Sequence, residues 1–358
     1  FVFYFYVMKS QDSFVILLLL VLYSCAQIVS PTGGEKDITK PKLVNTSLEK
    51  LNNDLRIKFQ FDESIQLNNW NENFYISPPV NNTIEKKIKS NFLTLSFSDS
   101  LFNKKTYNFC LNNAIKDMTE GNIIDTLNYT LNLEGLIDTI KLSGKVLEAK
   151  SLKPLKKTWV VLHENNILDS QLFEKTPEFV TKTNDDGNFI FPNLPNKKKY
   201  ELYALNKTEY FYDKKNIAFY DKSIETGVDT FVELFSFNLS DTLYHKNDTS
   251  NNVLNDSIIN LINGNIIVNS NLLTPCILQL IENETLVREE YFYKHPLIIK
   301  NVLPGSYTLK YIEDADLNKK WSNGSLQNRR QPERVFIYKN KLLIRENWDL
   351  EIDWNVKN

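Results

Sequence analysis

The sequence predicts an all-β protein built of tandem β-sandwiches, and three observations carry this prediction. First, apolar and polar residues alternate with a period of two in several segments, which is typical of strands buried on one face. Second, residue types that favour strands are abundant, with 22 phenylalanines and 17 tyrosines among 358 residues. Third, no segment combines a long helical period with capping residues at its ends. The chain exceeds the length of one typical domain, so we expect two or three modules.

The N-terminus is typical of a bacterial lipoprotein signal. Lys9 provides a positive charge, residues 14–23 form an apolar run, and Ser24 places a small residue before Cys25. The run is too short for a membrane-spanning helix, which needs about 20 residues. We therefore expect Cys25 to be a lipid attachment point. The alternative interpretation is a buried N-terminal strand or helix.

The lipoprotein interpretation assigns a signal peptide, a lipid anchor and a tether to the N-terminal part of the chain. Residues 1–24 are assigned to a signal peptide, with residues 1–7 upstream of a start at Met8. Acyl chains such as palmitate on Cys25 would anchor the protein to the outer membrane. Residues 25–40 form the lipidated tether. Because no acidic run directly follows the cysteine, we favour the periplasmic face over the cell surface.

The first module is expected at residues 41–135. Residues 55–61 alternate strictly, with Leu, Ile, Phe and Phe on one face. Three further stretches, 57–65, 75–79 and 113–122, follow an order that resembles bacterial Ig-like domains of the S-layer type. The resemblance implies an Ig-like sandwich whose final strand follows the third stretch.

The second module is expected at residues 138–237. Its strand-like segments lie at 140–146, 153–162, 183–191 and 194–203, and Asp-Gly at 186–187 indicates a tight turn. This order resembles the carboxypeptidase regulatory-like domain. The resemblance implies a small transthyretin-like sandwich without peptidase chemistry.

A third module, at residues 258–358, repeats the pattern of the second. Segments 263–268, 274–281 and 302–311 follow the same order, which predicts a divergent internal duplication and a second transthyretin-like sandwich. Residues 238–257 between the two are rich in Asn, Ser and Asp, as in a linker.

The whole chain resembles Ig-like-domain envelope lipoproteins of Bacteroidota. The residues that carry this likeness are Cys25, the Ser-Pro-Thr-Gly-Gly stretch at 30–34, and the tail segments 330–335 and 347–354. The resemblance implies an architecture rather than an activity, because function does not follow from fold.

Composition and motifs exclude several function classes. The formal net charge is −2 and both signs are mixed along the chain, so the sequence does not indicate a basic surface for binding nucleic acid. No phosphate-binding loop, dinucleotide fingerprint or Gly-x-Ser-x-Gly motif occurs. The acidic pairs at 62–63 and 185–186 are interpreted as solvated turn residues rather than catalytic carboxylates. We expect a protein that is not an enzyme.

Histidines and cysteines are too scattered for a metal site. His163, His245 and His295 have no neighbouring ligand at metal-binding spacing, and we expect His163 to follow a strand and form hydrogen bonds there. Cys110 and Cys276 lie far apart in the sequence, so a disulfide framework is not expected. Cys110 falls in a strand-like segment and is expected to pack as a small hydrophobic residue.

One polar cluster is a candidate for calcium. Asp314, Asp316 and Asn318 place oxygen atoms at alternate positions after the predicted strand at 307–312, as calcium loops do. The segment lacks a central glycine and a distal glutamate, and two lysines follow it. A polar turn without an ion is therefore the favoured interpretation, and no cofactor is expected apart from this calcium candidate.

Five Asp-Ser/Thr-aliphatic tripeptides resemble the O-glycosylation acceptor of exported proteins in the same bacterial group. The alternative is that such steps simply occur where loops enter strands. The candidate acceptors are Ser100, Thr126, Thr139, Thr242 and Ser257.

The expected function is that of a membrane-tethered scaffold or accessory subunit that binds another envelope protein. Its partners would be the membrane, through the N-terminal lipid, and that protein. The alternative is a carbohydrate-binding or polysaccharide-processing accessory, for which the aromatic clusters at 210–212 and 291–293 would provide a platform. A hydrolase is a third hypothesis without a local motif.

Overall fold

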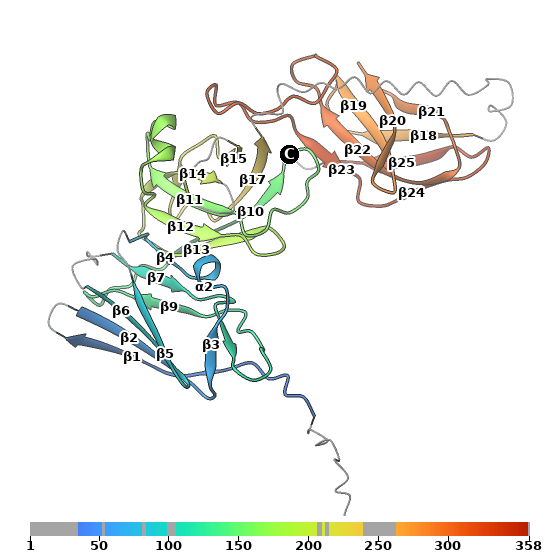
Figure 1. The fold of residues 1–358 in the computed structure, drawn as a ribbon. Helices are drawn as coiled ribbons and strands as arrows, with labels where there is room; N and C mark the ends of the chain where they lie inside the picture. The colour runs from blue at the N-terminus through green and yellow to red at the C-terminus, as the bar shows by residue number, and fades with distance from the viewer. Residues whose placement is uncertain are drawn as a thin grey trace, which may run out of the picture.

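The protein consists of three β-modules that follow one another along the chain (Figure 1). The computed structural model describes residues 35–51, 54–80, 84–98, 105–205, 210–211, 215–238 and 263–356. The predicted all-β fold with tandem β-sandwiches is confirmed. Helical structure in the described residues is limited to α2 (Trp70–Asn73) and the 3-10 turn η2 (Asp169–Phe173). None of these helices is long and apolar enough to cross a membrane.

The first module packs two main sheets around one core. A four-stranded sheet in the order β1-β2-β6-β5 faces a three-stranded sheet in the order β4-β7-β9, and β3 pairs with β8. Leu55, Ile57, Phe59 and Phe61 all point into this core, as the period-two pattern predicts. The strands are β1 (Leu43–Leu51), β2 (Asp54–Phe61), β3 (Ile65–Leu67), β4 (Tyr75–Ser77), β5 (Glu85–Lys89), β6 (Phe92–Ser98), β7 (Tyr107–Cys110), β8 (Ile115–Asp117) and β9 (Asn128–Leu131).

The second module is a strongly curved eight-stranded sheet. Its strand order is β12-β11-β14-β15-β17-β10-β13, with β16 paired to β14. The predicted Asp-Gly turn lies between β12 and β13, where Gly187 has a φ of 76°. The strands are β10 (Ile140–Glu148), β11 (Trp159–Glu164), β12 (Phe179–Lys182), β13 (Asn188–Leu194), β14 (Lys199–Ala204), β15 (Asn216–Phe219), β16 (Ile224–Glu225) and β17 (Phe231–Asn238).

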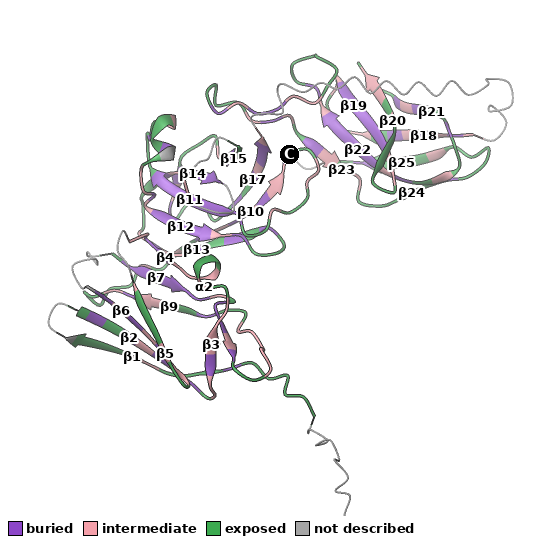
Figure 2. Ribbon diagram, viewed as in Figure 1, coloured by how far each residue is buried: buried purple, intermediate pink, exposed green. Residues whose placement is uncertain are grey.

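Strand β11 is buried on both faces (Figure 2). Val160 and Leu162 point into the core of the second module. Trp159 and Val161 point to the opposite side, into a second cluster that also contains Leu326 from far downstream. The continuous apolar run of this strand therefore reflects packing against another part of the chain.

The third module repeats the strand pairing of the second. In each, the first strand pairs antiparallel with the fourth and parallel with the last: β10 with β13 and β17, and β18 with β21 and β25. In each, the second strand pairs antiparallel with the third and the fifth. An internal duplication predicts this arrangement. The strands are β18 (Gly264–Ser270), β19 (Cys276–Glu282), β20 (Thr285–Phe292), β21 (Leu297–Val302), β22 (Gly305–Glu313), β23 (Val335–Ile337), β24 (Leu342–Ile344) and β25 (Leu350–Trp354).

A long loop fastens the third module to the second. Residues 314–334 connect β22 to β23, and we call them the connecting loop. Leu326 is buried among apolar residues of the second module. Arg329 donates a hydrogen bond to the hydroxyl of Tyr203, at 3.0 Å, and the Gln331 amide donates to the Phe219 carbonyl, at 2.8 Å.

Candidate functional site

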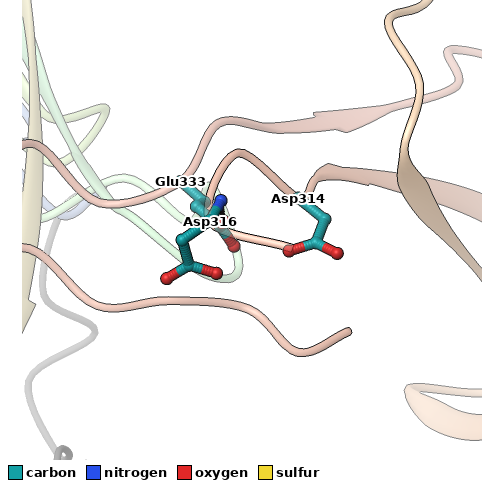
Figure 3. Close-up of side chains that lie close together, drawn as sticks. All are labelled: Asp314, Asp316 and Glu333. Atoms are coloured by element: carbon teal, nitrogen blue, oxygen red, sulfur yellow. Dashed lines mark hydrogen bonds between the residues drawn. The ribbon is translucent and has the colours of Figure 1, made fainter. Parts of the chain in front are cut away.

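Three carboxylates meet at the base of the connecting loop (Figure 3). Asp314 follows β22 and is only 1% exposed, Asp316 is next on the same turn, and Glu333 returns from the far end of the loop just before β23. One oxygen from each lies within 4.8 Å of the others. Hard cations such as Ca²⁺ bind such oxygens at 2.3–2.6 Å, so the spacing is compatible with a single bridging ion.

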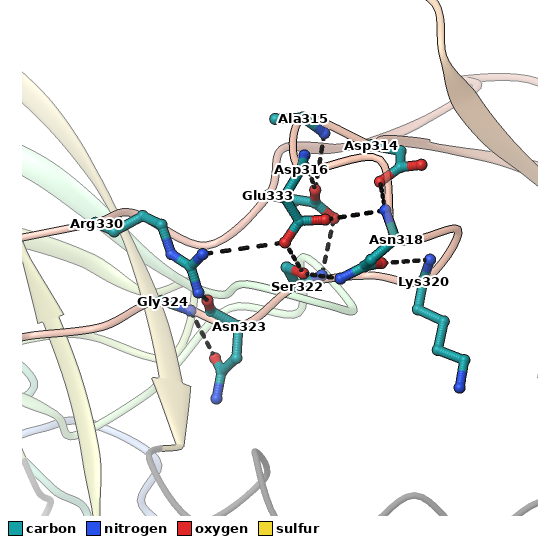
Figure 4. Close-up of polar contacts among 10 residues, drawn as sticks. All are labelled: Asp314, Ala315, Asp316, Asn318, Lys320, Ser322, Asn323, Gly324, Arg330 and Glu333. Carbon is teal, nitrogen blue, oxygen red and sulfur yellow. Dashed lines mark hydrogen bonds and ion pairs between the residues drawn. The ribbon is translucent and has the colours of Figure 1, made fainter. Parts of the chain in front are cut away.

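Backbone amides already engage all three carboxylates (Figure 4). Asp314 accepts hydrogen bonds from the amides of Asn318 and Lys319, at 3.0 and 3.1 Å. Glu333 accepts from the amides of Ala315 and Ser322, both at 2.8 Å. These bonds tie the two ends of the connecting loop together without an ion. We call Asp314, Asp316 and Glu333 with their bonded amides the clasp, because they can hold the two ends of the loop together as a polar turn.

The electrostatics of this cluster follow from burial. Burial raises the pKa of the Glu333 carboxyl, and the hydrogen bonds from backbone amides oppose that rise. Arg330 lies 4.0 Å from Asp316 and offsets one of the negative charges. The hydroxyl of Tyr291 bonds to Asp314, and burial together with this bond raises the pKa of Tyr291 to about 12.

The sequence pattern identified two of the three clustered carboxylates. The third predicted residue, Asn318, turns its amide to Lys320 and Ser322 instead. Glu333 takes its place in the cluster, although it lies far downstream in the sequence. Its position in the tail segment 330–335 was the one signal that singled it out.

Two of the candidate glycosylation acceptors lie in the described residues. Thr126 is exposed in the loop before β9, and Thr139 is exposed in the segment that enters β10. Both positions are accessible to a modifying enzyme. Ser100, Thr242 and Ser257 lie outside the described residues, as do Cys25, the signal segment and nearly all of the predicted linker.

The prediction for His163 was wrong. His163 lies within β11 rather than after it, is almost fully buried, and neither ring nitrogen has a hydrogen-bond partner in the described part of the chain. Burial is the main reason that its pKa falls to about 4. Cys110 and Cys276 are buried free thiols, as expected for cysteines that pack as small hydrophobic residues.

The first strand of the first module presents an open edge. Among the described residues β1 pairs only with β2, and none of them pairs with the other side of its backbone. Residues 43–48 carry no charge, and the side chains of Val44 and Leu48 are 61% and 41% exposed. Exposed edges usually carry charges or proline that block pairing with another chain.

The comparison with protein families concerns this same first module. Residues 37–131 match the model of the bacterial Ig-like domain. The match spans β1 to β9, so we refer to this part as the Ig-like module. A comparison with curated proteins finds no match.

Solved structures provide only distant likenesses. The Bacillus anthracis TIE protein is 13% identical over 91% of this chain, which spans 59% of that protein, with a TM-score of 0.19. A native alpha-2-macroglobulin from Escherichia coli, spanning domains MG0-NIE-MG1, is 11% identical over 83% of this chain and 96% of its own, with a TM-score of 0.21. The group B streptococcus pilus 2b backbone protein is 8% identical over 55% and 99%, with a TM-score of 0.18. TM-scores this low do not establish a shared overall fold.

Proposed function

We propose that the protein is a non-catalytic scaffold of the cell envelope that binds a partner protein through the open edge of β1. The observation that carries this proposal is the uncharged, exposed stretch at residues 43–48. An extended segment of a partner can add to such an edge through main-chain hydrogen bonds, with Val44 and Leu48 selecting its side chains.

The proposed anchor is the lipid on Cys25. The signal-like residues before it support this anchor, and the short distance along the chain from Cys25 to β1 would hold the binding edge near the outer membrane, on its periplasmic face. Several acyl chains on one residue suffice for stable attachment. Replacing Cys25 with Ser should move the protein from the membrane fraction to the soluble fraction. Unchanged fractionation would remove the anchor from the proposal.

The partner is sought by purifying the native protein in mild detergent and identifying co-purifying proteins by mass spectrometry. We expect a stable partner that is lost when Val44 and Leu48 are both replaced with Lys. Charged lysine side chains on an edge strand block pairing with a strand of another protein. The matched control is Leu343→Lys, a similarly exposed leucine on β24 of the third module. Recovery of no partner, or equal recovery with the edge variant, would contradict the scaffold function.

We also propose that Thr139 carries an O-linked glycan. Its exposure in the segment that enters β10 supports this assignment. Intact-mass measurement of the native protein should show a sugar increment that disappears with Thr139→Ala. A native mass equal to the polypeptide plus its lipid would dismiss the modification.

A further inference from the structure

Two pockets adjoin at the junction of the Ig-like module and the second module. The larger has a volume of about 630 Å³ and the smaller about 380 Å³. Tyr75 lines both pockets, and the Lys182 ammonium of the smaller one lies 4.1 Å from the ring centre of Trp159 in the larger one. They are therefore two halves of one groove, which we call the junction groove. It lies where β4 and α2 approach β12 (Figure 1).

The junction between these modules is held by specific contacts. Ser77 of β4 accepts a hydrogen bond from the Val180 amide of β12, at 3.0 Å, and the Tyr75 hydroxyl lies 3.3 Å from that of Thr181. Both modules thus contribute fixed walls to the groove. A preformed site with fixed walls loses little entropy when a ligand binds.

The larger half of the groove is an aromatic platform. The rings of Trp70 and Phe74 stack at 4.2 Å, and the Trp159 ring is met edge-on by Tyr75 at 5.2 Å and by Tyr210 at 5.5 Å. All of these rings except that of Trp159 are only half-buried, so they leave apolar area open in the groove.

A buried donor lies in the wall of this half. Trp159 is 5% exposed, and its indole N–H has no hydrogen-bond partner in the described residues. An unpaired buried N–H costs about 1–3 kcal/mol, so such groups are rare unless a water molecule or a ligand completes them. The nitrogen itself has almost no accessible surface, so a ligand in the groove meets the ring of Trp159 rather than its N–H.

The smaller half is polar and is lined by three carboxylates and two ammonium groups. Asn112 uses its amide oxygen to accept from the Leu127 amide, and its NH₂ group has no hydrogen-bond partner in the part of the chain that the structure describes. The exposed Asp185 carboxylate has no hydrogen-bond partner among the described residues and remains as an acceptor. The charged side chains of the whole groove are three carboxylates and three ammonium groups: Glu72, Asp125, Asp185, Lys86, Lys157 and Lys182.

We propose that the junction groove binds a neutral oligosaccharide. The C–H face of a sugar ring packs on aromatic rings, and sugar hydroxyls both donate and accept hydrogen bonds, which matches the Asp185 carboxylate and the Asn112 amide. The balanced charges favour a neutral ligand over an acidic one. A proline-rich peptide would also pack on aromatic rings, but it has few donors to offer Asp185.

The test uses the full-length protein and affinity gel electrophoresis in gels that contain laminarin, xyloglucan, galactomannan or dextran. At least one of these neutral polysaccharides should retard the wild type. Trp70→Ala and Asp185→Ala should each weaken the retardation about tenfold. Trp348→Ala is the matched control, because this tryptophan is 61% exposed on the third module. Asp185 is an exposed turn residue, so its variant tests the groove even if Trp70→Ala fails to fold.

Two further probes separate the groove from other ligand classes. Polygalacturonate represents acidic polysaccharides, and a ten-residue polyproline peptide represents peptide ligands. The proposal is overturned if none of the neutral polysaccharides binds, if only one of these two probes binds, or if the groove variants bind as the wild type does. Loss of the protein partner through the β1 variant should leave polysaccharide binding unchanged, so the two proposals fail separately.

Discussion

At the residue scale, His163 makes the stability of the protein depend on pH. The folded protein keeps this buried ring neutral, with a pKa of about 4, whereas the unfolded chain binds a proton near pH 6.5. The full stability is therefore present above pH 6.5 and is lost as the pH falls towards 4, by about 3 kcal/mol in total. Urea unfolding at a series of pH values measures this slope.

Two variants isolate the contribution of His163. His163→Phe should remove most of the slope between pH 6.5 and 4, because phenylalanine fills the site without a titrating group. His295→Phe is the control: its ring lies nearer the surface and is bonded to the Leu272 carbonyl at 2.9 Å. Equal slopes in the wild type and His163→Phe would rule out this histidine as the source.

The clasp at the base of the connecting loop leads to a second prediction at this scale. Glu333→Ala removes the acceptor of three backbone amides and should lower the unfolding free energy by about 1–3 kcal/mol. Because the loop is closed by its own hydrogen bonds, calcium should neither stabilise the wild type nor rescue the variant. A calorimetric binding signal that disappears with Asp316→Asn would instead show that the three carboxylates hold an ion.

Single residues also mark the limit of what the sequence predicts at a site. Asp314 and Asp316 were accessible to pattern analysis because they lie two positions apart on one turn. Trp159 was not, because only the folded chain brings it to its partners. Tyr210 and Glu333 fell within the aromatic cluster 210–212 and the tail segment 330–335, but the sequence did not indicate which residues they would meet. The lack of a hydrogen-bond partner for His163 among the described residues was missed for the same reason, because folding buries its ring beside Tyr203 of the neighbouring strand β14.

At the element scale, two glycines mark the place where the first and last strands of a module run side by side. A Cβ atom on Gly144 of β10 would collide with the Val232 carbonyl oxygen of β17 and with the Phe189 ring. A Cβ atom on Gly264 of β18 would collide with the carbonyl oxygen of Trp348, just before β25. The duplicated strand pairing thus imposes the same requirement on both modules.

This crowding predicts the effect of a single methyl group. Gly144→Ala should destabilise the second module by about 3 kcal/mol, because the packed backbone and ring leave no room for it. Lys145→Ala, at the neighbouring and partly exposed position, should change stability by less than about 1 kcal/mol. Thermal and urea unfolding compare the two. Similar stabilities of both variants would contradict the crowding.

The sequence predicts where strands lie better than it predicts which residues pack against them. The alternation at residues 55–61 reports a face buried within its own module, so it predicts the strand and its orientation together. The apolar run of β11 predicts a strand buried on both faces but not what covers it, since Leu326 lies more than a module away in the sequence. The pattern of apolar residues in a strand indicates which of its faces are buried. Which residues pack against those faces is decided only by the tertiary fold.

At the scale of the whole molecule, the connecting loop holds the third module on the second. Leu326→Asp places a charge in the apolar cluster around Phe219 and Phe237 and should release the loop. Small-angle X-ray scattering should then show a larger radius of gyration, while circular dichroism stays that of a β-protein. Gln327→Asp, at the neighbouring exposed position of the same loop, is the control. An unchanged radius of gyration in the Leu326 variant would mean that other contacts hold the modules.

The parallel pairing of first and last strands also determines how the modules respond to mechanical force. The chain enters the second module at the start of β10 and leaves it at the end of β17, and β18 and β25 repeat this geometry. Tension applied to the two ends of such a module pulls the paired strands lengthwise past each other. All hydrogen bonds of the ladder then bear the load together instead of opening one at a time. A chain anchored at one end and gripped at the other would therefore resist extension most strongly at these two strand pairs.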